Sequence, residues 1–357
     1  MMKAREQEGE KSSPQADREP RRSRASGRAR IEDVARLAEV SAQTVSRYYR
    51  EPAAVSADAS ARIRRAAELI GYVPNLIAGS LASNRSHIVA IVVPTIANPA
   101  HSVWVQGLTE TLAAEGYQVL LGATNYDPAR ERDLVRAFLG RRVDGVVITG
   151  AVLDPEADDL LRRVRVPTVQ VLELPRNPID MAVGVDNQAC GAAIADHLVA
   201  RRYRRLAVVG SRAKADTRAA ARAAGFLRRA QERGLARPVE LAVDRPADIG
   251  VGPQLLADIL AIDPPVEAVF CVGTQISVGL MLACLAAGVE VPRRLAVAGF
   301  SDGDLAAMLS PSLTTIRVPA IEMGRKAGQL LLSRLRGGEP DAAVADVGFQ
   351  LVVGDST

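Results

Sequence analysis

Apolar residues recur at helical spacing between Ile31 and Ile70, and this pattern predicts three short helices. The first helix has the apolar face Ile31, Val34, Ala35, Leu37 and Ala38. A short turn, Glu39–Ser41, follows it, and the next helix directs Val45 inward and polar side chains outward. Two short helices around so tight a turn indicate a helix-turn-helix, a motif whose second helix enters the major groove of DNA.

The third helix is expected from Ala57 to Ile70, because Ser56 can cap its first turn and Gly71 can end it. Its inner face consists of Ile63, Ala66, Ala67 and Ile70. Pro74 then breaks the helix, and the segment LIAGSLA that follows is too short to be stable alone in water. We therefore interpret residues 76–86 as a hinge helix that folds only when it has a partner.

From His87 onward, apolar strand runs alternate with helical stretches. The runs are HIVAIVVP, YQVLLGA, DGVVITG, PTVQVLE, MAVGVDN, RLAVVG, EAVFCVG and RLAVAGF. Such runs indicate parallel sheets that are covered by helices on both faces. These runs are more numerous than the strands of one ordinary sheet, so we predict two doubly wound lobes with a boundary near Val185 to Gln188. Ligands bind beyond the carboxyl ends of such strands, which favours the cleft between the lobes.

Positive charge is concentrated toward the N-terminus. Between Arg21 and His87 there are twelve basic and six acidic residues, a local net charge of +6, whereas the whole chain has +4. A concentration of positive charge is expected in a protein that binds the phosphates of nucleic acid, although a solvated charged face has the same composition. Residues 1–29 are polar, rich in Arg, Glu, Ser and Pro, and without periodicity, so we expect a disordered basic tail there.

The composition argues against several classes of protein. Aromatic residues make up only 3% of the chain, which disfavours stacking platforms for single-stranded nucleic acid. The cysteines are expected to be small core residues: Cys190, Cys271 and Cys284. The histidines lack metal-ligand spacing, GVGPQL lacks the third glycine of a dinucleotide loop, and no P-loop or nucleophile elbow occurs. We therefore expect no metal, no cofactor and no enzyme. No membrane-spanning run or signal peptide is seen, which indicates a cytoplasmic protein.

Several motifs together resemble the lactose-repressor (LacI/GalR) family of bacterial transcription factors over residues 31 to about 354. They are IEDVARLA, TVSR, GYVPN, the hinge residue Leu81, IVVPTIANP, RRVDGVVITG, and GFSDGD followed by SPSLTTIR. Further segments resemble the gluconate-repressor branch of that family: LELPRNPIDMAVGVDN, LLSRLRGGEP and DVGFQL.

The resemblance implies an all-α helix-turn-helix head and an α/β two-lobed periplasmic-binding-protein-like sensor with two doubly wound parallel sheets. The expected parts are a tail at 1–29, a DNA-binding domain at 30–75, a hinge at 76–86, a first lobe at 87–187 with 316–345, and a second lobe at 188–315 with 346–357. The chain would cross between the lobes near Asn187, near Thr315 to Val318 and near the C-terminus. A homodimer on a pseudo-palindromic, double-stranded operator is implied as well, together with a small-molecule effector.

Three residues of the second helix fall on its outward face and could read DNA bases. Gln43 can pair with adenine, Arg47 with guanine, and Ala42 can contact a thymine methyl group. Ser41 is expected to cap the helix and leave its first N–H groups close to DNA. The alternative is that Gln43 and Arg47 are merely solvated.

The resemblance assigns further DNA contacts outside that face. Thr44, Tyr72 and Asn75 match family positions that touch phosphates, and such contacts set the register rather than the sequence preference. Leu81 matches a hinge leucine that wedges between base pairs in the minor groove, with Ala78 packing close to it. Burial of Leu81 against the sensor is the alternative.

Effector contacts are also implied by matching positions. Arg222 matches an arginine that grips the effector, and Arg218, one turn earlier, is a second candidate because guanidinium groups suit carboxylates, phosphates and hydroxyl pairs. Glu173 matches a sugar-binding acid. His101 matches an aromatic residue that stacks on the ligand, although a histidine at a helix start could be solvent-exposed. Trp104 is expected in the core.

This sequence departs from the family pattern at several positions. Glu39 replaces the usual glycine of the turn, where a left-handed conformation would cost about 1 kcal/mol. Thr274 and Ser301 replace acids, and losing two carboxylates removes repulsion toward an anionic ligand. These departures favour a sugar acid such as gluconate. Glu173 counts against that, unless it binds hydroxyl groups far from the carboxylate.

Together, these features predict a ligand-responsive repressor of a carbohydrate or sugar-acid operon, released from its operator when the effector binds. A small-molecule binding protein without a regulatory role is the alternative, and the helix-turn-helix argues against it. Residues Val344 to Val353 are expected to form a strand with only four residues after it, so no leucine-heptad helix follows to join dimers into tetramers.

Overall fold

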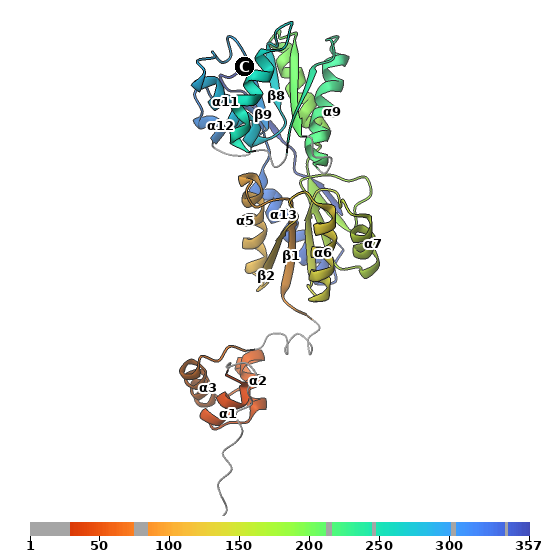
Figure 1. The fold of residues 1–357 in the computed structure, drawn as a ribbon. Helices are drawn as coiled ribbons and strands as arrows, with labels where there is room; N and C mark the ends of the chain where they lie inside the picture. The colour runs from red at the N-terminus through yellow and green to blue at the C-terminus, as the bar shows by residue number, and fades with distance from the viewer. Residues whose placement is uncertain (1–28, 75–84, 212–215, 245–247, 301–304, 340–341) are drawn as a thin grey trace, which may run out of the picture. The chain divides into compact units, whose positions relative to one another are not determined.

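The computed structural model describes residues 29–74, 85–211, 216–244, 248–300, 305–339 and 342–357 (Figure 1). The chain divides into two compact units, Met1–Ala82 and Ser83–Thr357, and each is described by itself. Almost all of the predicted tail and hinge lies outside the described residues. Arg85 and Ser86, the last residues of the predicted hinge, are not helical.

The first unit contains the three predicted helices and a short 3-10 turn: α1 Ile31–Leu37, α2 Ala42–Arg50, η1 Pro52–Ala54 and α3 Ala57–Ile70. Their apolar faces form one core of Val34, Ala35, Ala38, Val45, Ile63, Ala66 and Ala67. Ser56 caps α3 by accepting a hydrogen bond from Ala59 N, and Gly71 ends it with a φ of 63°. Leu37, predicted to face inward, is 47% exposed, because one residue step turns it about 100° away from Ala38.

The turn of the helix-turn-helix keeps a left-handed residue. Glu39 has a φ of 53°, so a glutamate adopts the conformation that a glycine would adopt without strain. The next residue closes the turn, because Val40 N donates a hydrogen bond to Ala35 O at 3.0 Å. The geometry of the turn is therefore preserved at a cost of about 1 kcal/mol.

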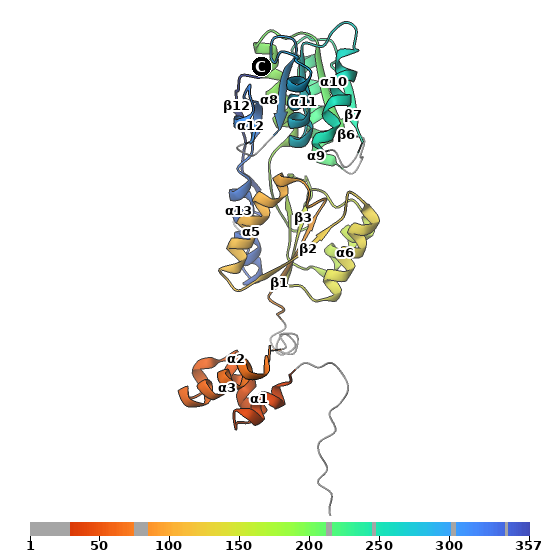
Figure 2. The same ribbon diagram turned by 60° about the vertical axis from the view of Figure 1, so that its left-hand side comes forward.

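The second unit contains two six-stranded sheets, one in each lobe (Figures 1 and 2). The first sheet has the order β11 Val344–Asp346, β5 Met181–Gly184, β4 Thr168–Val171, β3 Gly145–Thr149, β1 Ile88–Val93 and β2 Gln118–Ala123, and all its neighbours are parallel. The second has the order β12 Gln350–Val352, β10 Thr314–Arg317, β9 Ala296–Phe300, β8 Ala268–Cys271, β6 Leu206–Ser211 and β7 Val239–Val243. Its strands are parallel except for β12, which pairs antiparallel with β10.

Helices cover both faces of each sheet, as the near-continuous apolar strands require. The first lobe has α5 Pro99–Ala113, α6 Pro128–Gly140, α7 Pro155–Val164 and α13 Ala320–Leu335. The second lobe has α8 Asn187–Ala200, α9 Thr217–Glu232, η2 Ile249–Val251, α10 Gly252–Leu260, α11 Thr274–Ala286 and α12 Leu305–Met308. In the first lobe α5 packs beside α13 (Figure 1). In the second lobe α8 packs beside α9.

The chain passes between the lobes after β5, after β10 and after β11. Strand β10 ends at Arg317, so the second of these passages falls within the predicted crossing at Thr315 to Val318 and two residues after the lobe boundary given at 315. Residues 344–353 do not form the single strand that we predicted. Gly348, with a φ of 68°, turns the chain after β11, and β12 then joins the other sheet.

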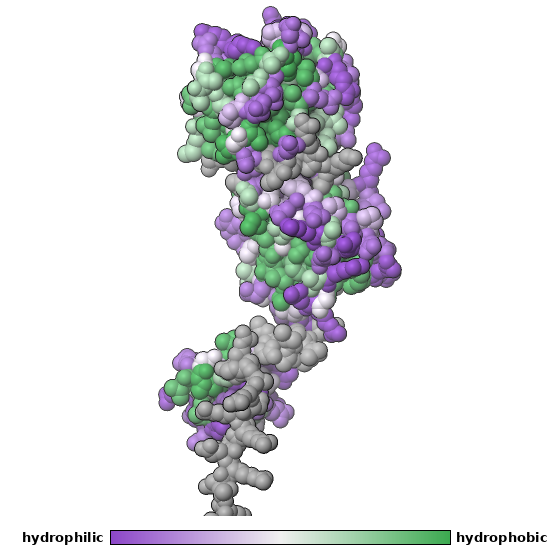
Figure 3. Space-filling model, viewed as in Figure 1, coloured by the Kyte–Doolittle hydropathy of each residue, from purple (hydrophilic) through white to green (hydrophobic). Residues whose placement is uncertain are grey.

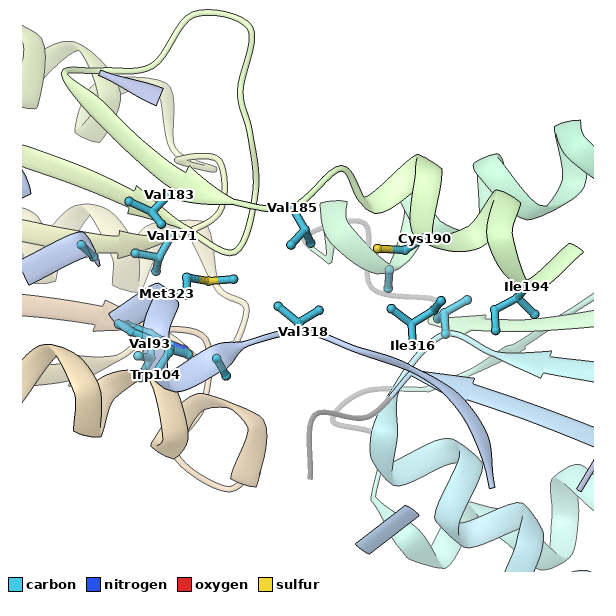
Figure 4. Close-up of a cluster of buried hydrophobic side chains, with 14 of the residues drawn as sticks. Val93, Trp104, Val171, Val183, Val185, Cys190, Ile194, Ile316, Val318 and Met323 are labelled. Carbon is cyan, nitrogen blue, oxygen red and sulfur yellow. The ribbon is translucent and has the colours of Figure 1, made fainter. Parts of the chain in front are cut away.

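One hydrophobic core runs through both lobes along the passages (Figure 4). Val185 and Val318 lie on the connecting segments, between Met323 of the first lobe and Ile316 of the second. Because these side chains are at most 3% exposed, the connections are buried rather than loose. The two lobes therefore share a packed joint, and Val185 and Val318 of this joint also line the cavity between the lobes.

Glycines let the helix pairs approach to backbone contact. A Cβ on Gly324 of α13 would lie 1.9 Å from Trp104 O of α5, and a Cβ on Gly191 of α8 would lie 1.9 Å from Arg222 O of α9. Both distances are far below any van der Waals contact, so only glycine fits. This close packing fixes α5 and α9, the helices that carry much of the candidate ligand site.

Candidate functional site

The surface of α2 presents the predicted DNA-reading side chains. Ser41 caps the helix, since its Oγ accepts a hydrogen bond from Thr44 N at 3.0 Å and lies 2.8 Å from Thr44 Oγ1. Gln43 and Arg47, four residues apart, share one exposed face, while Ala42 and Thr44 are half-buried beside it. Val45 is fully buried and holds the opposite face on the core.

Arg47 is available to bind a partner, whereas two other arginines of this unit form ion pairs. Arg36 pairs with Asp33 at 2.7 Å, and Arg62 pairs with Asp58 at 3.3 Å. Within the described part of the unit, Arg47 makes no ion pair and no side-chain hydrogen bond. An extended cation on an exposed helix face beside Gln43 has the chemistry to contact guanine or a phosphate.

Tyrosines gather on the same unit, which the sequence reasoning missed. Tyr48, Tyr49 and Tyr72 are half of the six tyrosines of the chain. The ring of Tyr49 lies 6.0 Å from that of Tyr72, which we predicted as a phosphate contact. Burial raises the pKa of the Tyr72 hydroxyl, so it remains a hydrogen-bond donor at neutral pH. Asn75, Ala78 and Leu81, the other predicted contacts, lie outside the described residues.

A cavity of about 80 Å³ lies between the two lobes of the second unit. It brings together four predicted effector residues: His101, Arg218, Arg222 and Thr274. Further polar lining residues, which we did not predict, are Asn98, Tyr126, Asn187, Asp216 and Gln275. Glu173 does not line it, and Ser301 lies outside the described residues. The α5 and α9 residues reach the cavity because both helices begin beyond the carboxyl ends of β1 and β6.

Arg222 is fixed by several neighbours. Its Nε donates to Val272 O at 2.9 Å, and its Nη1 donates to Asn187 Oδ1 at 2.6 Å. The guanidinium carbon lies 4.0 Å from the centre of the Phe300 ring, a cation–π distance. Asn187 in turn donates to Leu172 O at 3.0 Å, which connects Arg222 to the first lobe. These contacts hold the side chain of Arg222, a residue that is 8% exposed, at the wall of the cavity.

Arg218 lies one turn before Arg222 and is 7% exposed. Its Nη2 lies 3.9 Å from Asp216 Oδ1, a weak ion pair within α9's first turn. Among the described residues, its Nη1 has no hydrogen-bond partner. A buried donor without an acceptor is costly, so this nitrogen is a candidate contact for a ligand oxygen.

His101 is buried, not solvent-exposed, with 5% of its surface accessible. Trp104 Nε1 donates to His101 Nδ1 at 3.5 Å, and Trp104 itself lies in the core as predicted. Burial, and next the charge of Arg218, lower the pKa of His101 to about 3, with Asp216 opposing them. His101 is therefore neutral at physiological pH, so it can contact a ligand as a polar group but not as a cation.

Glu173 and Thr274 make contacts that differ from those expected. Glu173 Oε2 accepts hydrogen bonds from Ala151 N at 3.1 Å and Thr217 Oγ1 at 3.0 Å, so it joins the lobes beside the cavity. Thr274 lines the cavity, but its hydroxyl donates to Phe300 O at 2.8 Å. Both groups have protein partners, which reduces what they offer to a ligand.

The described residues contain no group of three or more His, Cys, Asp and Glu side chains arranged to hold a metal ion. The three cysteines are buried, as predicted, and burial raises the pKa of Cys284 to about 11 and that of Cys190 to about 12. Within the same residues, no helix combines the length and the apolar character needed to cross a membrane.

Comparison with known proteins agrees with this architecture. Residues 30–75 match the family "Bacterial regulatory proteins, lacI family", and residues 195–357 match a periplasmic binding protein-like domain. The HTH-type transcriptional regulator GntR of Pseudomonas aeruginosa is 35% identical over 335 residues, covering 94% of this chain and 97% of the relative.

Solved structures show the same fold. A LacI-family transcriptional regulator from Silicibacter pomeroyi superposes with a TM-score of 0.85 at 28% identity, covering 92% of this chain and 99% of the other. The lac repressor dimer bound to operator and the anti-inducer ONPF gives a TM-score of 0.78 at 22% identity, with the same coverage. The predicted fold and family are confirmed: this chain belongs to the LacI family of bacterial, DNA-binding transcriptional regulators.

Proposed function

We propose that this protein represses genes for the use of a sugar acid such as gluconate, and that the acid releases it from its operator by binding between the lobes. The observation that carries this proposal is the charge of the cavity. Two guanidinium groups, Arg218 and Arg222, line it with a single carboxylate, Asp216. A buried excess of positive charge is stabilised by an anionic ligand, and guanidinium groups are well suited to carboxylates.

The remaining lining suits a polyhydroxylated chain. Asn98, Asn187 and Gln275 supply amide groups, and Tyr126 and Phe300 supply flat apolar surface. Gln275 Nε2 also donates to Ala97 O of the opposite lobe at 3.4 Å. A ligand that contacts both lobes would favour one arrangement of them over another, and such a difference in affinity is what couples two sites.

Calorimetry with D-gluconate and D-glucitol tests the ligand class, because the two differ only in the carboxylate. We expect gluconate to bind at least about 10-fold more tightly, the factor that one charge-assisted hydrogen bond supplies. Gluconate should also weaken operator binding in a gel shift. Tighter binding of the neutral glucitol, or gluconate binding without any effect on the operator complex, would contradict the proposal. The second result would favour a sugar-binding protein without a regulatory role.

Base readout by α2 gives a second test. Replacing Arg47 by alanine should cost about 1 to 3 kcal/mol of operator binding and relax the preference at one base position in each half-site. Selection from a randomised operator library measures both effects. Arg36→Ala, on α1, is the control, and it should leave the base preference unchanged. An unaltered preference for Arg47→Ala would show that this side chain is only solvated.

We expect the protein to act as a homodimer, because one short helix reads only a half-site. Exposed apolar residues collect on the second lobe where α11 and α12 lie (Figures 1 and 3). They include Leu285, 69% exposed, and Met308, 80% exposed. Light scattering should report twice the mass of one chain. Leu285→Glu should shift the protein toward monomer, whereas Val164→Glu on α7, 52% exposed, should not. Equal effects of the two changes would place the interface elsewhere.

A further inference from the structure

We propose that His101 and Arg218 form a two-donor subsite for an acceptor oxygen of the ligand, and that Trp104 fixes the tautomer of His101 that this requires. The inference rests on the proposed function, because the subsite belongs to the same cavity. It assigns the acid group of the ligand to these side chains rather than to Arg222. His101 is carried by α5 of the first lobe and Arg218 by α9 of the second.

Two unsatisfied donors identify the subsite. Both side chains line the cavity and both are more than nine-tenths buried, with 5% of His101 and 7% of Arg218 exposed. Among the described residues, neither His101 Nε2 nor Arg218 Nη1 has a hydrogen-bond partner. Buried polar atoms in folded proteins are nearly always paired, so two residues that line one cavity and each carry an unpaired buried nitrogen are candidates to bind an acceptor oxygen of a ligand. The cavity has a volume of only about 80 Å³, and His101 lines it from the first lobe and Arg218 from the second.

The indole of Trp104 determines which ring nitrogen of His101 carries the proton. An indole N–H can only donate, so His101 Nδ1, 3.5 Å away, must accept. In a neutral imidazole the other nitrogen, Nε2, then carries the hydrogen. His101 therefore presents a donor, and it calls for a ligand acceptor such as a carboxylate or carbonyl oxygen.

The surroundings of His101 keep it neutral. Arg218 and Asp216 are the charged groups that face it from α9, and burial together with Arg218 lowers its pKa to about 3. Helix α13, which packs on α5, contributes Glu322 and Arg325, and these pair at the surface with each other and with Glu110 of α5. The donor at Nε2 is therefore present throughout the physiological range of pH.

The two arginines of the cavity differ in their contacts. Arg222 already uses Nε and Nη1 on Val272 O and Asn187 Oδ1, whereas Arg218 retains an unused donor. An oxygen held by His101 and Arg218 would contact one residue from each lobe. That oxygen would accept hydrogen bonds from two buried donors and bridge the lobes. The ligand would therefore bind more tightly to the arrangement of the lobes that brings the two donors together, and this difference in affinity can drive a conformational change.

Nitrogen-15 NMR of the histidine side chains tests the tautomer in the full chain without any ligand. The chain has only three histidines, and His101→Gln identifies the signals of His101. We expect a protonated Nε2, an unprotonated Nδ1 and no titration between pH 5.5 and 8. Trp104→Phe should add a population with protonated Nδ1. A protonated Nδ1 in the wild type, or titration near pH 6.5, would overturn the inference.

Formate, the smallest carboxylate, tests the subsite independently of the sugar. It should shift the Nε2 signal of His101 in the wild type and have much less effect in Arg218→Met. The absence of a shift at saturating formate would overturn the subsite. If formate and the tautomer behave as expected but gluconate does not bind, the proposed sugar-acid effector fails while the subsite stands.

The affinity for gluconate gives a quantitative test of the role of His101. His101→Leu should weaken gluconate binding about 10-fold, as expected for a lost hydrogen bond to a charged group, and leave glucitol binding nearly unchanged. His101→Gln, whose amide can replace the Nε2–H donor, should restore affinity to within about 3-fold of the wild type. His197→Gln is the matched control, because His197 contacts Thr357 instead of the cavity. Equal losses for both ligands would mean that His101 only supports the fold.

Discussion

Replacing Arg222 by methionine should reduce gluconate affinity about 100-fold and leave an operator complex that gluconate no longer releases. The methionine fills much of the space but removes the cation that stacks on Phe300 and donates to Val272 O and Asn187 Oδ1. The cavity would lose one of its two positive charges, and Asn187, which also lines it, would lose the donor that orients it. A hydrogen bond from a charged donor is worth about 1.5 to 3 kcal/mol, so a disordered and less positive cavity wall should bind an anion much more weakly even though Arg222 is not the group that holds the acid. Calorimetry and gel shifts with and without gluconate measure both consequences.

The comparison with Arg228→Met makes this result interpretable. Arg228 lies on the same helix, is exposed, and donates to Gln188 Oε1 at 2.8 Å. Its replacement should leave gluconate affinity and release unchanged. Arg222→Lys should behave like Arg222→Met, because an ammonium group cannot reproduce the flat, forked contacts. Full release of an Arg222→Met complex by gluconate would show that the effector binds elsewhere.

A single methyl group at Gly191 should strongly destabilise the second unit. A Cβ there would lie 1.9 Å from Arg222 O and 2.9 Å from Phe226 N, and both are backbone atoms that cannot move aside cheaply. We expect the free energy of unfolding to fall by about 3 kcal/mol, at the upper end of what overpacking costs. The midpoint of thermal unfolding, followed by the fluorescence of Trp104, measures the change.

Gly140→Ala is the control for this change. Gly140 is the last residue of α6, and a Cβ there would meet nothing within 4 Å. Because alanine is the better helix former by about 1 kcal/mol, the substitution should be neutral or slightly stabilising. Similar losses for both variants would mean that glycine flexibility, and not the close approach of α8 and α9, explains the effect.

The head could be predicted from the sequence because its determinants are local. Helix caps at Ser41 and Ser56 act on backbone N–H groups three residues away, and Gly71 ends α3 within the same turn. The apolar spacing then places Val34, Val45 and Ile63 in the core. Glu39 is the instructive exception, since it adopts the left-handed turn despite the strain. There the packing of α1 against α2 prevails over the preference of one residue.

The strands were predictable where the sequence carries a continuous apolar run. Fully buried runs such as β1 and β3 were identified, since only a strand covered on both faces is apolar throughout. Strands β7 and β10 were missed, because Val239–Val243 and Thr314–Arg317 contain charged or hydroxyl side chains and carry no continuous apolar run. The division of 344–353 between two sheets was also missed. That division depends on which strands lie next to β11 and β12, and the residues of 344–353 do not indicate those neighbours.

The sequence predicted several of the residues that line the ligand site, but only partly which groups those residues contact. The sequence by itself determined that arginines begin the helix after β6 and that histidine and tryptophan lie one turn apart on α5. Only the tertiary structure decided that Asn187 and Phe300 hold Arg222, that Glu173 bonds to Thr217 beside the cavity, and that His101 is buried and neutral. The physical reason is that caps and helical faces depend on neighbours a few residues away. Hydrogen-bond partners and pKa values in a cleft depend instead on groups that the fold brings together from distant parts of the chain.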